Sequence, residues 1–199
     1  MKKTAIALCL LIALIGCKRQ ESYNTETTET TNTAATTDTS MTASGSMSTA
    51  GTVADMAPAD KEFIAKAGMG GLAEVQMGSV AVQKASNAAV KAFGQRMVDD
   101  HSKANEELKT LATAKGLALP TELDHEHKST LDHLSSLSGK EFDKAYMDDM
   151  VEDHEKDVAE FEKASQTAMD GETKAWAAKT LPTLQDHLKM AKETQGNVK

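Results

Sequence analysis

The feature that most constrains the fold of this chain is an eleven-residue phrase used twice, at residues 91–101 and 144–154. In both copies an aromatic residue, a methionine and a histidine follow one another at spacings of four. They are Phe93, Met97 and His101 in the first copy, and Tyr146, Met150 and His154 in the second. On an α-helix this spacing puts the three side chains on one face. Because a buried imidazole needs a hydrogen-bond partner, the phrase predicts two helices that each carry a partnered histidine.

Apolar residues at spacings of three and four predict four long helices. We expect them at residues 59–84, 88–115, 139–170 and 171–196. The segment from Ser138 to Glu141 has the pattern of a capping box, which would open the third helix. The long connection before it is expected to contain a short helix with Leu131, Leu134 and Leu137. This pattern predicts an all-α four-helix bundle with a long connection between its second and third helices.

Four polar side chains lie on the apolar stripes: Glu74, His101, His154 and His187. Short turns near residues 85 and 170 would pair the helices antiparallel and bring the four to similar heights, so we expect them to meet mid-bundle. One interpretation is a metal site, since three imidazoles and a carboxylate suit zinc, iron, copper, nickel or manganese. A second is a buried histidine–carboxylate network without metal. In the third, some of the four lie in solvent at helix boundaries.

Acids adjoin the three histidines in the sequence. They are Asp100, Asp153 and Asp186. Adjacent helical residues point about 100° apart, so each acid either serves a histidine of another helix or faces water. With Tyr146, these acids are the candidates for a layer of side chains around a metal. Three further histidines, His125, His127 and His133, fall in the long connection and are interpreted as solvated.

Charge and composition argue against several classes of function. A net charge of -8 argues against nucleic acid as a partner. Both cysteines, Cys9 and Cys17, lie near the start, so the rest of the chain has no cysteine nucleophile and no thiolate zinc site. No Ser-His-Asp arrangement, phosphate loop or nucleotide fingerprint is visible. The Glu-x-x-His pairs of di-iron bundles are also missing, which argues against ferroxidase or oxygenase chemistry.

The first 56 residues predict targeting and a tether. Two lysines and a short apolar run in residues 1–17 indicate a signal peptide rather than a membrane-spanning helix. The run ends in Gly16-Cys17, which resembles the lipobox of bacterial lipoproteins and implies lipidation of Cys17. By resemblance to enterobacterial lipoprotein sorting, Lys18 after the cysteine implies the outer membrane, facing the periplasm. Residues 18–56 are rich in Thr and Ser and predict a disordered tether, which leaves 57–199 as the domain.

Four motifs and one single histidine within residues 58–192 carry a family resemblance. They are Gly70-Gly71-x-x-Glu74-Val75, the Asp-His that follows Met97-Val98, Phe142-Asp143-x-x-Tyr146, His154, and Leu181-Pro182-x-Leu184-x-x-His187-Leu188. Together they resemble a ferritin-like bacterial family, domain of unknown function 4142, often labelled as outer-membrane proteins. The resemblance implies a ferritin-like bundle in the cell envelope and implies no activity.

Two functions of different classes follow. The first is an envelope lipoprotein that binds a divalent metal or small ligand through the mid-bundle His and Glu residues, with a link to stress. The second is a structural or interaction module of the envelope whose histidines form a metal-free network. An enzyme is the least favoured class, and the only partner that the sequence indicates is the membrane, through the lipid anchor.

Overall fold

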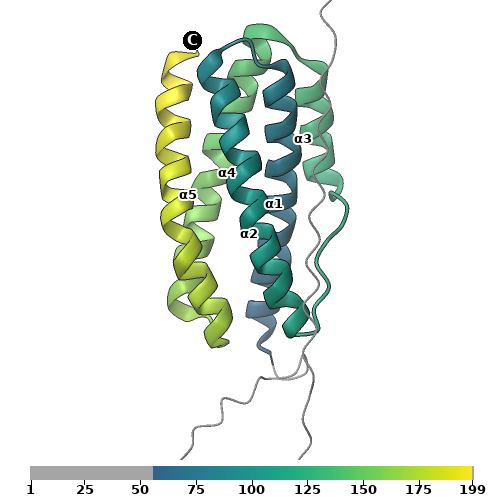
Figure 1. The fold of residues 1–199 in the computed structure, drawn as a ribbon, viewed down its shortest axis with the longest axis vertical. Helices are drawn as coiled ribbons and strands as arrows, with labels where there is room; N and C mark the ends of the chain where they lie inside the picture. The colour runs from purple at the N-terminus through teal and green to yellow at the C-terminus, as the bar shows by residue number, and fades with distance from the viewer. Residues whose placement is uncertain (1–55, 199) are drawn as a thin grey trace, which may run out of the picture. The chain divides into compact units, whose positions relative to one another are not determined.

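The computed structural model describes residues 56–198 and is all-helical over that range (Figure 1). Its helices are α1 (Pro58–Lys84), α2 (Ala88–Ala114), α3 (His125–Ser136), α4 (Gly139–Thr167) and α5 (Gly171–Asn197). The predicted all-α class is confirmed for this part of the chain, and so is the short helix in the long connection. None of the described helices is both long and apolar enough to cross a membrane. The predicted signal peptide, Cys17 and almost all of the tether lie outside the described residues.

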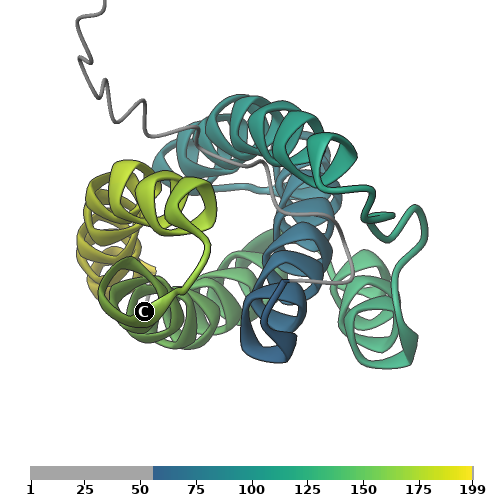
Figure 2. The same ribbon diagram turned by 90° about the horizontal axis from the view of Figure 1, so that it is seen from below.

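The four long helices lie side by side, and α3 lies outside them (Figures 1 and 2). The most extensive packing is between α1 and α2 and between α4 and α5, while α3 packs mainly on α1. The short loop predicted near residue 85 connects α1 to α2, and the one predicted near residue 170 connects α4 to α5.

Local chemistry sets most helix ends. Pro58 occupies the first turn of α1, where its missing N–H costs nothing. The side chains of Asn87, Asp124 and Asp170 accept hydrogen bonds from backbone N–H groups in the first turns of α2, α3 and α5. The predicted capping box at Ser138 is wrong, because the Ser138 side chain makes no capping hydrogen bond. α4 also ends at Thr167, slightly before the predicted boundary.

Each of the two short loops is held by an aspartate from the other helix pair. Asp143 of α4 accepts hydrogen bonds from the backbone N–H groups of Ser86 and Asn87 in the α1–α2 loop. Asp60 of α1 does the same for Met169 and Asp170 in the α4–α5 loop. Both aspartates are buried, so these bonds satisfy charges that would otherwise be costly.

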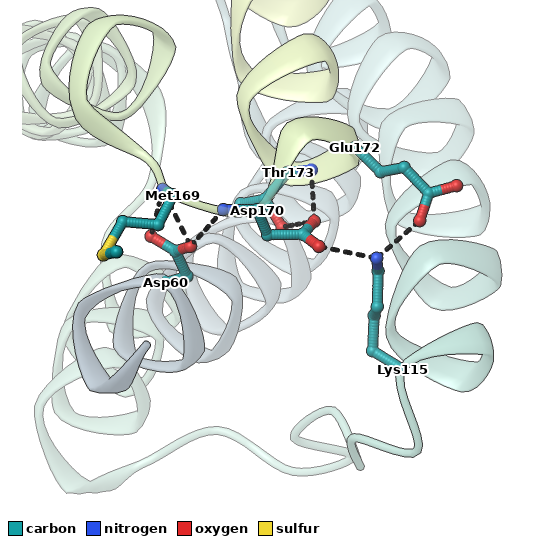
Figure 3. A network of polar contacts seen from close by, with 6 residues as sticks. All are labelled: Asp60, Lys115, Met169, Asp170, Glu172 and Thr173. Carbon is teal, nitrogen blue, oxygen red and sulfur yellow. Dashed lines mark hydrogen bonds and ion pairs between the residues drawn. The ribbon is translucent and has the colours of Figure 1, made fainter. Parts of the chain in front are cut away.

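A buried lysine extends the second of these contacts (Figure 3). Lys115, at the end of α2, pairs with Asp170 at 2.6 Å and with Glu172 at 2.5 Å. Asp170 also caps Thr173 at the start of α5. One network therefore joins α1, α2, the α4–α5 loop and α5 at this end of the domain.

The apolar core is divided into two clusters along the helices. One includes Met77, Phe93 and Met150, toward the α1–α2 loop. The other includes Phe63 and Phe161, toward the α4–α5 loop. On α2, α4 and α5 the residues between the two clusters include one of the three histidines, and on α1 Glu74 lies next to Ala73, the member of the first cluster that is nearest to the second. The fold therefore places a polar layer between two apolar ones.

Candidate metal centre

The polar layer is formed by one side chain from each long helix: Glu74 of α1, His101 of α2, His154 of α4 and His187 of α5. All four are buried, with exposed fractions of 2%, 6%, 0% and 0%. The centres of the three imidazole rings lie 5.2–5.7 Å apart. One potential ligand atom from each histidine lies within 4.8 Å of the other two.

The apolar stripes position these residues. His101 follows the buried Met97 by one helical turn, and His154 follows the buried Met150 by one turn. His187 comes three residues after the buried Leu184. The same burial that fixes the methionines and the leucine therefore carries the three imidazoles into the interior.

One ring nitrogen of each histidine lies close to an oxygen atom, in a hydrogen bond at His154 and His187 and in an ion-pair contact at His101. His101 Nδ1 lies 2.7 Å from Glu74 Oε2. His154 Nδ1 lies 2.9 Å from the backbone oxygen of Met150, and His187 Nε2 lies 2.9 Å from Asp100 Oδ2. A carbonyl or an ionised carboxylate only accepts, so His154 Nδ1 and His187 Nε2 carry the proton. His101 Nδ1 carries it when Glu74 is ionised.

The opposite nitrogen of each ring is buried and has no hydrogen-bond partner among the described residues. These atoms are Nε2 of His101, Nε2 of His154 and Nδ1 of His187. In the neutral rings each carries a lone pair. Glu74 Oε1 is likewise unpaired, and it lies 3.3 Å from His154 Nε2 without hydrogen-bond geometry. The four side chains of the layer thus present unpaired acceptor atoms, and the described residues nearby also include two unpaired buried donors, the Tyr146 hydroxyl and Trp176 Nε1.

Burial also sets the protonation states. It lowers the pKa of His101, His154 and His187 to about 4 in each case, because the apolar surroundings disfavour the imidazolium. Burial raises the pKa of Glu74 to about 7, against the opposing pull of His154. The pKa of Asp100 is lowered although burial opposes this, because Arg96 and His187 donate hydrogen bonds to it. The histidines are therefore neutral at neutral pH, the form in which imidazole binds a metal.

A cavity of about 30 Å³ adjoins the layer between α1, α2 and α5. Its lining includes Glu74, His101 and His187, together with Gly71 and Asn105. Gly71 has no room for a side chain, since a Cβ there would lie 2.2 Å from Asn105 Oδ1. The space is sufficient for a water molecule, so an ion held by the imidazoles could keep one water.

The four residues that were predicted to surround the metal ligands differ in their contacts and in their burial. Asp100 bonds a histidine, but that histidine is His187 of another helix rather than the adjacent His101. Asp153 is half-buried and lies 3.9 Å from Lys156, and Asp186 is exposed. Tyr146 is buried, and its hydroxyl has no partner among the described residues. The structure therefore brings one of the four, Asp100, into hydrogen-bond contact with the imidazoles.

The histidines of the long connection lie apart from this centre, on α3. His125 and His133 are exposed, and His127 pairs with Asp124 of its own first turn. The backbone oxygen of Met150 is a site contact that sequence reasoning missed, since any residue supplies a carbonyl. Asp157 of α4, which lines the cavity beside Glu74, was also missed. Its position one turn after Asp153 was the available signal.

Comparisons with known proteins identify a family model that matches the chain and solved structures with a similar fold. The sequence model described as "Domain of unknown function (DUF4142)" matches residues 45–194. No curated protein matches the chain. The structure resembles a DUF305 fragment from Deinococcus radiodurans, with a TM-score of 0.63 and 11% identity, over 71% of this chain and 98% of that one. It also resembles "putative secreted protein DUF305" from Streptomyces coelicolor, with a TM-score of 0.60 and 12% identity, over 70% and 93% of the two chains.

Proposed function

The chain belongs to the DUF4142 family, whose function is unknown, and we propose that it binds one divalent transition-metal ion through His101, His154 and His187. Imidazole ligands suit zinc, copper, nickel and iron. Glu74 supplies either a fourth ligand through Oε1 or the acceptor that orients His101. The protein is a metal-binding module of the cell envelope, built on a ferritin-like four-helix bundle.

The observation that carries this proposal is the direction of the ring protons. His154 and His187 donate an N–H to a backbone carbonyl and a carboxylate, and His101 Nδ1 lies 2.7 Å from Glu74 Oε2. The other nitrogen of each ring has no partner among the described residues. Metal-ligating histidines are held in this way, because the outer hydrogen bond fixes the tautomer and the ring orientation. Leaving a buried acceptor unpaired costs on the order of 1–3 kcal/mol. A cation shared by the free nitrogens removes that cost for all three rings at once.

The geometry is compatible with such an ion after a small adjustment. Zinc–nitrogen bonds of about 2.0–2.1 Å put two tetrahedral nitrogen ligands about 3.4 Å apart. The potential ligand atoms lie within 4.8 Å of one another, so rotations of the imidazoles close the remaining distance. A bound ion would supply positive charge to the layer. The three neutral imidazoles and the Glu74 carboxylate would hold it.

The test is a melting experiment on the purified protein with Zn²⁺, Ni²⁺ and Cu²⁺. An ion that binds only the folded state raises the melting temperature as its concentration rises. We expect His154→Ala to lose this response and His125→Ala, an exposed histidine on α3, to keep it. If none of these ions raises the melting temperature of the parent, the metal proposal is wrong.

A metal-free network is the second candidate, and the pKa of Glu74 favours it. With that pKa raised to about 7, Glu74 holds a proton at and below neutral pH, and this proton can lie between Oε1 and His154 Nε2. The layer then stabilises a structural module and binds no ion. No response to metal, together with marked destabilisation by His154→Ala, would support this candidate.

The cellular location remains part of the proposal. The predicted signal peptide and Gly16-Cys17 support a lipid anchor on the outer membrane, facing the periplasm. A structural neighbour is also described as secreted. We expect Cys17→Ser to abolish acyl labelling in cells and to release the protein from the membrane fraction. Undiminished labelling of that variant would show that the anchor is elsewhere or absent.

A further inference from the structure

An acidic groove lies on the side of the domain where α4 meets α1 and the long connection. Its volume is about 460 Å³, more than tenfold that of the inner cavity. Asp153, Asp157 and Glu160 of α4 line one wall, and Asp124 and Glu126 lie near the start of α3. Clefts lined by one sign of charge concentrate ions of the opposite sign, so this groove attracts cations.

The groove and the inner cavity share three lining residues: Gly70, Glu74 and Asp157. These residues form the partition between solvent and the histidine layer. Glu74 is 2% exposed and its Oε1 has no hydrogen-bond partner among the described residues. At Gly70 an added Cβ would meet only Asp157 Oδ1, at 4.0 Å. The partition is therefore thin, and two carboxylates flank it.

The lysines of the groove do not neutralise the partition. Lys66 pairs with Glu62 and Glu160, and Lys156 lies closest to Glu152, at 2.8 Å. Asp157 forms no ion pair with any residue in the described part of the chain. The opposite face of the layer differs, because its carboxylate, Asp100, already accepts hydrogen bonds from Arg96 and His187. On the groove side, Asp157 and Glu74 have no lysine or arginine partner among the described residues.

We propose that the metal ion enters and leaves the three-histidine centre through this groove, passing from Asp157 to Glu74 and then to the imidazoles. The inference rests on the proposed metal site and adds the path by which the ion reaches that site. Each carboxylate oxygen replaces one water of the hydrated ion, so the ion sheds its water in steps. No bond within the protein is made or broken. Asp157 is a positioning residue of the route and is not a ligand of the bound ion.

The route is tested by the kinetics of Co²⁺ uptake by the purified full-length protein, followed by the visible absorption of the bound ion, and by its release to a chelator. Asp157→Asn keeps the size of the side chain and removes its charge. We expect it to slow uptake and release together, each by about tenfold, because a route changes the barrier in both directions. The equilibrium dissociation constant then stays within about threefold of the parent value.

Two controls separate a route from a general effect of charge. Asp186→Asn removes the same charge from an exposed site on α5. Glu160→Gln removes a charge from a groove residue that does not line the inner cavity. Both are expected to leave the rates within about twofold of the parent, as surface charges do when screened. Gly70→Leu, which fills the partition without changing charge, is expected to slow both rates as Asp157→Asn does.

The outcomes distinguish the two proposals. If the parent protein gives no Co²⁺ absorption and no metal-dependent melting, the metal site itself is refuted, and the route with it. If the parent binds and both Asp157→Asn and Gly70→Leu keep its rates, the route is wrong and the site stands. Faster release of Co²⁺ from Asp157→Asn with unchanged uptake would make Asp157 a ligand and would also overturn the route.

Discussion

At the scale of single residues, each histidine of the centre has one ring nitrogen close to an oxygen atom and one buried nitrogen without a partner among the described residues. The three free nitrogens and Glu74 Oε1 leave one short contact between two acceptors, at 3.3 Å between Glu74 Oε1 and His154 Nε2. An ionised carboxylate facing an imidazole lone pair is repulsive, and either a proton or a metal ion relieves it. Binding of metal and protonation of Glu74 are therefore alternatives at the same place.

Replacing Glu74 by glutamine separates these alternatives. The carbonyl of the new side chain could accept from His101 Nδ1 while its amide donates to His154 Nε2, which satisfies both contacts without any ion. Because its pKa is raised to about 7, Glu74 stabilises the fold fully below its unfolded pKa of 4.5 and loses that contribution as the pH rises through 7. We expect Glu74→Gln without metal to be more stable than the parent at pH 8, by on the order of 2 kcal/mol, and to respond less to metal.

The measurement is denaturant unfolding at pH 5 and pH 8, with and without Zn²⁺. The stability advantage of Glu74→Gln should be smaller at pH 5, where the parent residue is protonated in the folded state. Glu106→Gln, an exposed residue of α2, is the control and should match the parent at both values. A Glu74→Gln variant that is destabilised at pH 8 would contradict the proposed contact between two acceptors.

The histidines give a second prediction at this scale. With their pKa values lowered to about 4, the three rings stay neutral as the pH falls through 6.5, where a solvated imidazole gains its proton. Their share of the stability is complete above 6.5 and is lost as the pH falls toward 4. Imidazole NMR signals of the metal-free protein should show three rings that stay neutral between pH 7 and pH 5, with only the shifts that the titration of Glu74 causes at His101 and His154. Titration of His101, His154 and His187 near 6.5 would mean that the layer is hydrated.

At the scale of helices, the two copies of the repeated phrase have different surroundings. Gly94 in α2 occupies the place that Met147 takes in α4. A Cβ at Gly94 would lie 2.7 Å from the Cβ of Ala81 and 3.0 Å from the backbone oxygen of Gly78. α2 therefore approaches α1 backbone to backbone, and these atoms cannot rotate away as a long side chain could.

Gly94→Ala tests this close approach. The added methyl group must push α1 and α2 apart, and overpacking of this kind costs about 1–3 kcal/mol, more than the gain in helix propensity from alanine. Gly196→Ala in α5 is the matched control, because nothing lies within 4 Å of its added Cβ. We expect thermal melting to show a loss of stability for Gly94→Ala and none for Gly196→Ala. Equal melting temperatures would show that the two helices can separate at no cost.

Helical periodicity was sufficient to predict the long helices and the height at which Glu74 and the three histidines lie. It could not predict which acid serves which ring, because that depends on the rotation of each helix against its neighbour. Asp100 consequently bonds His187 rather than His101. The capping hydrogen bond predicted for Ser138 does not form, although the sequence matches the capping-box pattern. Gly139, the next residue, takes a left-handed conformation with φ of 60°, which changes the backbone geometry that a capping box needs.

At the scale of the whole molecule, the described residues form two apolar clusters, a polar layer and two short loops that are each bound by the opposite helix pair. Each loop is fixed by an aspartate from the other helix pair, so neither pair is expected to be stable without its partner. Met56, just before α1, is buried at 8% exposure and belongs to the cluster near the α4–α5 loop. We therefore expect the folding unit to include Met56.

A chain that begins at Met56 should fold alone, melt cooperatively and keep the metal response of the full-length protein. A chain that begins at Ala59 loses the buried Met56 side chain, worth about 2 kcal/mol of apolar burial, and Pro58 from the first turn of α1. We expect it to melt at a lower temperature and still to respond to metal, since the histidine layer lies between the two apolar clusters and away from this end. Circular dichroism melting with and without Zn²⁺ measures both effects. Loss of cooperative melting in the chain that begins at Met56 would show that residues 1–55 are part of the folding unit.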